Sequence, residues 1–310
     1  MGRRYTQINA DQTAGHLRLS AFICVPLIWL VAAQVQAAEW KLSVQPSPVP
    51  QGGIVFVRLE GGRTPDQPTC EWLGHKYSLY PAGGGYRAAL PVDRLQKVGL
   101  AAVVVRAAGY QQPLATRNLS VVALHTGPIE VIRLTPERMA LNQDPRVEEE
   151  SKRLRQIVRT QSPQQLWKGD FSPPTDQPGH NFGKQRRYLE VARKGRKAAP
   201  GWMSYHRGTD FSLPPGTPVP AANAGRVLAA EPFVLPGNAV FLDHGQGLIT
   251  AYMHLSEIKV KPGDWVSPGQ IVGLTGNTGR ATGPHLHWAL YVQGVSVNPT
   301  TVLHLPDLFR

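Results

Sequence analysis

Cysteine and long apolar runs are both scarce in this sequence of 310 residues. The chain has two cysteines, Cys24 and Cys70, and Cys24 lies in an N-terminal segment that we expect to be removed. No internal disulfide is therefore expected, and export does not require one. The apolar run over residues 21–33 has 13 residues, which is too few to span a bilayer comfortably.

This short apolar run suits a secretory signal. Positive charge precedes it at Arg3, Arg4 and Arg18. The sequence Val-Gln-Ala at 35–37 offers small residues at the positions that a signal peptidase reads. We predict a signal peptide over residues 1–37 and an exported protein of the periplasm or cell envelope, with a later start of the chain or an uncleaved anchor as the alternatives.

Acidic residues are also in short supply. The chain has 21 Asp and Glu against 33 Lys and Arg, which gives a formal net charge of +12. This excess indicates an anionic partner, and nucleic acid, anionic lipid and an anionic cell-wall polymer all fit it. Residues 180–200 hold seven Lys or Arg and one acidic residue, Glu190. They lack the interleaved aromatics of single-strand binders, so we predict a solvated basic loop, or a rim that attracts an anionic polymer, and no nucleic-acid partner.

Sustained helical periodicity is rare, whereas the chain contains 31 Gly and 28 Pro. Turn-forming residues at this frequency favour a mainly β fold. Between Trp40 and about Leu124, short strand patterns alternate with glycine-rich turns, most clearly at 54–59, 86–90 and 100–105. Strands of this length and spacing predict an N-terminal immunoglobulin-like β-sandwich, which we place at residues 38–127.

One interdomain helix is predicted after the sandwich. It opens at Asp144-Pro145, where proline suits the first turn, and its apolar residues approximate one helical face. We expect it to end near Thr160, within a linker over residues 128–170.

Four histidines and one aspartate are concentrated in the C-terminal half of the chain. His206 and Asp210 form a His-x-x-x-Asp pattern, His254 follows a strand-like segment, and His285-Leu286-His287 opens another. On a strand, residues two apart face the same side at a spacing of roughly 6.5–7 Å. One imidazole of the last pair can therefore bind a metal while the other stands beside it.

Zinc binds nitrogen and carboxylate oxygen, and a catalytic zinc site keeps one of its four positions open for water. His206, Asp210 and His287 supply three such ligands. Hydrolysis also needs a proton acceptor and a group that stabilises the oxyanion. The helical His-Glu-x-x-His signature with its glutamate base is absent, which leaves His254 and His285 as candidates for these two roles.

Three motifs then give a resemblance. His206-x-x-x-Asp210, Tyr252-x-His254-Leu255 and Gly283-Pro284-His285-x-His287, in this order, resemble those of the lysostaphin-type (LytM-like) zinc metalloendopeptidases, of the Gram-negative periplasmic type. The likeness runs from about residue 171 to residue 303.

The resemblance implies a C-terminal antiparallel β metallopeptidase domain over residues 171–310. It implies one Zn²⁺ per chain, bound by His206, Asp210 and His287, with His254 and His285 as catalytic histidines. The implied substrate is the stem peptides or crosslinks of peptidoglycan.

The segment 190–202 interrupts the family pattern ahead of the first zinc ligand. His244, which stands between Asp243 and Gly245, is predicted to be a turn residue outside the site. The function predicted is a zinc-dependent endopeptidase of cell-wall remodelling. The alternative is a non-catalytic LytM-like regulator of another murein hydrolase, and the intact motifs favour the enzyme.

Overall fold

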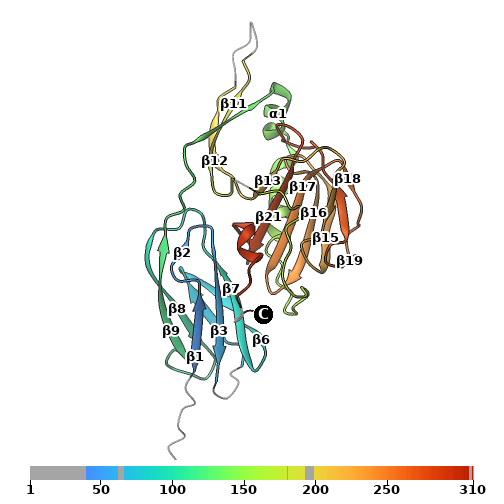
Figure 1. Ribbon diagram of the computed structural model, residues 1–310. Coiled ribbons are helices and arrows are strands. Elements are labelled where there is room, and N and C mark those ends of the chain that lie inside the picture. The colour runs from blue at the N-terminus through green and yellow to red at the C-terminus, as the bar shows by residue number, and fades with distance from the viewer. Residues whose placement is uncertain (1–39, 62–65, 180, 193–198, 307–308, 310) are drawn as a thin grey trace, which may run out of the picture. The chain divides into compact units, whose positions relative to one another are not determined.

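A computed structural model describes residues 40–61, 66–179, 181–192, 199–306 and 309. The predicted signal peptide, residues 1–37, lies outside the described residues. The prediction of a mainly β chain is confirmed, because the strands of the described part form five sheets (Figure 1).

Two of these sheets pack around a core in the N-terminal part of the described chain. Their strands, in spatial order, are β1 (Lys41–Gln45), β3 (Ile54–Glu60), β7 (Gly85–Pro91) and β6 (Tyr80–Ala82) in one sheet, and β2 (Val49–Pro50), β9 (Ala115–Val122), β8 (Gly99–Arg106), β4 (Thr69–Trp72) and β5 (His75–Ser78) in the other. Trp72, Leu90 and Val103 are fully buried in this core. The strands predicted at 54–59, 86–90 and 100–105 are found as β3, β7 and β8.

The strand β3 is apolar along most of its length because it packs on both faces. Val55 and Leu59 belong to the core between the two sheets. Successive side chains of a strand point to opposite faces, so Ile54 and Phe56 point into a second core. There the ring of Phe56 lies 4.8 Å from that of Phe309, centroid to centroid.

Helices follow these two sheets. They are α1 (Pro136–Ala140), the 3-10 turn η1 (Leu141–Gln143) and α2 (Arg146–Ile157). The α2 helix begins directly after Pro145 and ends three residues before the predicted Thr160. Its residue Leu154 packs against a buried apolar cluster that includes the adjoining Val158 and Phe241 of the C-terminal sheet. No helix in the described part of the chain has the length and apolar character needed to cross a bilayer.

A third sheet, which we call the arm sheet, consists of β10 (Glu130–Leu134), β11 (Gln185–Glu190) and β12 (Trp202–Tyr205). β11 runs parallel to β10 and antiparallel to β12. The prediction of a solvated basic loop is therefore wrong for residues 185–190. Tyr188 and Glu190 are buried while Arg187 is exposed, so β11 alternates as a strand despite its charge.

The C-terminal part contains a seven-stranded antiparallel sheet and a smaller one beside it. The large sheet has the order β13 (Thr209–Phe211), β21 (Leu286–Val292), β17 (Leu248–Leu255), β16 (Gly237–Gly245), β15 (Gly225–Phe233) and β19 (Trp265–Val266), with β22 (Val295–Val297) paired to β21. The small sheet has the order β14 (Pro218–Pro220), β20 (Ile271–Leu274) and β18 (Glu257–Ile258), and a 3-10 turn, η2 (Pro299–Val302), follows. The neighbours β13, β21 and β17 carry the histidine motifs.

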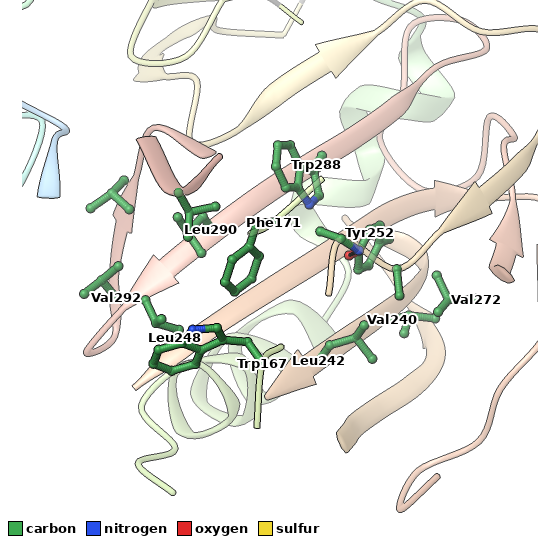
Figure 2. Close-up of a cluster of buried hydrophobic side chains, with 14 of the residues drawn as sticks. Trp167, Phe171, Val240, Leu242, Leu248, Tyr252, Val272, Trp288, Leu290 and Val292 are labelled. Atoms are coloured by element: carbon green, nitrogen blue, oxygen red, sulfur yellow. Dashed lines mark hydrogen bonds between the residues drawn. The ribbon is translucent and has the colours of Figure 1, made fainter. Parts of the chain in front are cut away.

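One face of the large sheet is covered by a buried apolar cluster (Figure 2). Trp288, Leu290 and Val292 of β21 point into it and pack with Trp167 and Phe171. Because these are alternate residues, the side chains between them face the opposite side of the sheet. The apolar period of β21 thus decides which face receives His287.

Candidate metal centre

His206, Asp210 and His287 come together on the face of the sheet opposite the apolar cluster. Asp210 and His287 are direct cross-strand partners of β13 and β21. Asp210 Oδ1 lies 2.8 Å from His287 Nδ1 and 3.1 Å from His206 Nε2, and the two imidazole nitrogens are 3.0 Å apart. Within the described ranges, this is the one group of three or more such side chains that could hold a metal ion.

His206 lies in the short connection between β12 and β13 and is almost fully buried. Its Nδ1 lies 2.9 Å from the carbonyl oxygen of Asn181. A carbonyl can only accept, so Nδ1 carries the proton and Nε2 presents its lone pair to the centre. Gly208 leaves room for the ring of His287, because a Cβ at position 208 would lie 2.5 Å from His287 Nε2.

Asp210 is held from its other oxygen by an arginine that the sequence reasoning missed. Arg186 of β11 places Nη2 2.9 Å from Asp210 Oδ2 and Nε 2.7 Å from Glu130 Oε2. Burial raises the pKa of Asp210, but the adjacent imidazoles of His206 and His287 outweigh this effect and hold that pKa well below its usual range. Asp210 is therefore ionised, with Oδ1 directed to the imidazoles and Oδ2 to Arg186.

His254 and His285 lie next to these three residues. Their ring centroids are 4.8 Å apart, and the ring of His254 is 5.9 Å from that of His287. His285 precedes β21, and its Nε2 lies 3.7 Å from Asp210 Oδ1. The structure thus brings together all five residues that the sequence singled out.

Backbone carbonyls orient both of these imidazoles. His254 Nδ1 donates to the carbonyl of Thr278 at 2.9 Å, and His285 Nδ1 donates to the carbonyl of Gly283 at 2.8 Å. In each case Nε2 is left as the acceptor nitrogen. His254 has a left-handed backbone, with φ of 62°, and its N–H donates to the carbonyl of Pro236. A residue other than glycine in this region marks a strained position, of the kind found at functional sites.

Burial keeps these histidines neutral. It lowers the pKa of His206 to about 4, and it lowers the pKa of His254 well below the usual value, with repulsion from His285 as a second cause. The pKa of His285 is also lowered, again mainly by burial. Two imidazole nitrogens and one carboxylate oxygen form the donor set that zinc prefers, so the residues present fit such an ion.

A groove with a volume of about 1210 Å³ opens over the five residues. Arg186 and Tyr188 of the arm sheet, Arg155 of α2 and Arg280 of the preceding loop also line it. The groove is therefore large enough for a peptide and is rich in arginine.

His244 lies away from this centre. It belongs to the buried end of β16, so the prediction of a turn residue is wrong. Its Nδ1 donates to the carbonyl of Ala224 at 2.7 Å, and its Nε2 lies 2.7 Å from Thr250 Oγ1. These two bonds satisfy the ring within the core.

The fold is an antiparallel β domain whose neighbouring strands bring two histidines and an aspartate to one point. This arrangement is that of a single-metal site with two further imidazoles beside it. Residues 204–299 match the profile of Peptidase family M23, so the chain contains a domain of that family.

Curated relatives resemble this domain. A stretch of 93 residues is 52% identical to the peptidoglycan DD-endopeptidase ShyA of Vibrio cholerae, covering 30% of this chain and 22% of that protein. Another of 104 residues is 41% identical to the DD-carboxypeptidase/endopeptidase Mpg of Neisseria meningitidis, covering 33% and 24%. The chain thus spans about a quarter of the length of these relatives.

A solved structure extends the likeness beyond the domain. A crystal structure described as a peptidase M23 from Pseudomonas aeruginosa superposes with a TM-score of 0.59 at 29% sequence identity. The match covers 83% of this chain and 96% of that one. The fold upstream of residue 204 is therefore shared as well.

Proposed function

We propose that this protein is a zinc-dependent endopeptidase that hydrolyses amide bonds in the stem peptides or crosslinks of peptidoglycan during cell-wall remodelling. The observation that carries the proposal is the convergence of His206, Asp210 and His287 next to His254 and His285. The membership of residues 204–299 in a peptidase family supports it. So do the names of two relatives, a peptidoglycan DD-endopeptidase and a DD-carboxypeptidase/endopeptidase.

His206 Nε2, Asp210 Oδ1 and His287 Nδ1 would hold one zinc ion per chain. When bound, zinc supplies Lewis-acid activation of water and of the scissile carbonyl. Arg186 orients the aspartate for this task, because it occupies the other carboxylate oxygen.

His254 and His285 handle protons in this scheme. In each ring, the Nδ1–H group donates a hydrogen bond to a backbone carbonyl, and Nε2 is unprotonated. One of them accepts a proton from the attacking water. The other, with a proton taken up from bulk water at Nε2, donates a hydrogen bond to the oxygen that gains negative charge and keeps this proton. The first histidine then returns the proton of the attacking water to the leaving amine.

The proposed organisation follows the sequence: a signal peptide at 1–37, an accessory sandwich at 38–127, a linker with helix at 128–170 and the peptidase domain at 171–310. Export to the periplasm or cell envelope brings such an enzyme to its substrate, the murein sacculus. The positive charge of the chain suits that anionic polymer.

The test is to incubate the purified protein with intact peptidoglycan sacculi, with and without a chelator, and to identify released fragments by mass spectrometry. The wild type should release peptide fragments, and the chelator should stop the release. Asp210→Ala should lose zinc, whereas His285→Ala should keep zinc and lose turnover. Wild-type rates in His285→Ala would refute the role of that residue. A zinc-retaining wild type that releases nothing would favour the regulator.

A further inference from the structure

Arg280 occupies an unusual position in the wall of the groove. It lies in the loop before His285, and its guanidinium carbon is 5.0 Å from the ring centroid of Tyr188 and 5.4 Å from that of Trp202. These two aromatic rings stack on each other at 4.9 Å. Cation–π contacts of this kind fix the orientation of a guanidinium group.

Among the residues that the structure describes, Arg280 has no acidic partner. Its Nη1 donates to Asn142 Oδ1 at 2.5 Å, which is a neutral acceptor. No carboxylate of the described residues lies within 4.0 Å of it, whereas Arg186 has two such partners. Burial lowers the pKa of Arg280; Tyr188 opposes this effect, and the like charge of Arg186 adds to it. A half-buried cation that is repelled by its neighbour is stabilised by an anion from outside the chain.

The loop that carries Arg280 is held in place. Its backbone N–H donates to the carbonyl of Leu235 at 2.9 Å. Arg138 of α1 donates to the carbonyls of Gly279 and Asn277, just before it. The guanidinium is therefore positioned before any ligand arrives, which reduces the entropic cost of binding.

The rest of the groove has a matching charge. Its lining includes Arg94, Arg155 and Arg207, for which the described residues provide no carboxylate partner within 4.0 Å. Of the three lining acids, Glu130 and Asp210 are engaged by Arg186, and Asp93 accepts a hydrogen bond from the backbone N–H of Leu95. The surface that surrounds the metal centre thus attracts an anionic peptide.

We propose that Arg280 binds a free carboxylate of the substrate peptide close to the scissile amide. The inference rests on the proposed function and names the substrate class: peptides that carry an unamidated carboxylate there. The planar guanidinium is suited to this task because it can donate two parallel N–H bonds to one carboxylate.

The test compares two synthetic crosslinked stem peptides that differ in one group, a free carboxylate beside the scissile bond or its amide. The zinc-loaded full chain should cleave the acid with a kcat/KM about ten- to hundredfold higher, mainly through KM. Arg280→Gln should remove this preference by slowing only the acid, and Arg280→Lys should restore part of it. Arg187→Gln changes an exposed arginine of β11 outside the groove lining, and it should keep the preference.

A wild type without preference, or an Arg280→Gln variant that keeps it, would overturn the proposal. If Arg207→Gln removes the preference instead, the carboxylate binds elsewhere and the proposal is equally wrong. Calorimetric binding of both peptides to His285→Ala, with and without Arg280→Gln, makes the same comparison without turnover. If the wild type cleaves neither peptide, the proposed function fails, while the binding data still decide the role of Arg280.

Discussion

At the scale of single residues, the metal centre depends on groups that hold the five central side chains without belonging to their motifs. The Thr278 carbonyl orients His254. The Thr278 hydroxyl donates a hydrogen bond to the carbonyl of Leu255 and accepts one from the backbone N–H of Asn238. Arg186 does the same for Asp210 from another sheet. Partners of this kind commonly change metal affinity or activity by ten- to hundredfold.

Arg186→Met should therefore weaken zinc binding by about ten- to hundredfold, because Asp210 loses the contact that directs Oδ1 to the centre. Competition with a chromophoric chelator measures this affinity without reference to turnover. Arg187→Met removes an equal charge from an exposed position of the same strand and should bind zinc like the wild type. Equal affinities for all three proteins would exclude a positioning role for Arg186.

A second residue-scale prediction concerns His244 and pH. Burial lowers its pKa to about 4, against about 6.5 in the unfolded chain, so the unfolded state binds more protons between these values. The stability that neutral His244 contributes is present above pH 6.5 and is lost as the pH falls towards 4. From pH 7.5 to 5.0 the loss is about 2 kcal/mol.

Urea unfolding at the two pH values measures this loss. His206, His254 and His285 act in the same direction, so the informative quantity is the difference between wild type and His244→Gln. The variant should show a pH dependence smaller by about 2 kcal/mol. If both proteins lose the same free energy of unfolding, His244 does not titrate as its burial requires.

At the scale of elements, the alternation of β21 places an apolar row on one face and the histidines on the other. Trp288 is fully buried in the cluster of Figure 2, whereas Trp265 of β19 is 64% exposed. Trp288→Ala should cost about 3–5 kcal/mol of unfolding free energy, and Trp265→Ala should change it by less than about 0.5 kcal/mol. Chemical denaturation monitored by circular dichroism compares the two. Equal losses would show that the alternation is not what holds the strand.

The same element explains what the sequence could predict. His285 and His287 are two residues apart within an apolar strand pattern, so their common face is readable from the chain alone. The sequence does not predict β11 as a strand, because its arginines are charged and only Tyr188 and Glu190 show the alternation of buried and exposed side chains. Its parallel partner β10 lies more than 50 residues upstream, and no local pattern indicates such a pairing. Arg186 and Arg280 could not be placed without it.

At the scale of the whole described chain, Arg87 joins two parts that are far apart in sequence. It is 97% buried on β7, donates to the carbonyl of Phe309 at 2.7 Å and to Gln246 Oε1 at 3.1 Å, and lies 4.9 Å from the rings of Trp167 and Phe309. Its removal leaves buried acceptors without a donor, and such groups are costly.

Arg87→Met should lower the free energy of unfolding by about 2–3 kcal/mol. Arg106→Met is the control, because Arg106 forms an exposed ion pair with Glu71 that contributes about 1 kcal/mol or less. Urea denaturation of both variants measures the difference. A loss in Arg87→Met no larger than in the control would contradict the view that this contact ties the parts together.

The two-sided packing of β3 has a consequence for how this sequence tolerates change. Neighbouring positions on this strand pack in different cores. Val55 packs in the core of the sandwich, and Phe56 packs in the core beneath the peptidase sheet. Excising the N-terminal region would strip apolar cover from that core. The sandwich thus contributes β3 to two cores at once. A peptidase domain that is moved to another protein should keep β3, or should have polar residues at the apolar positions that its loss would expose.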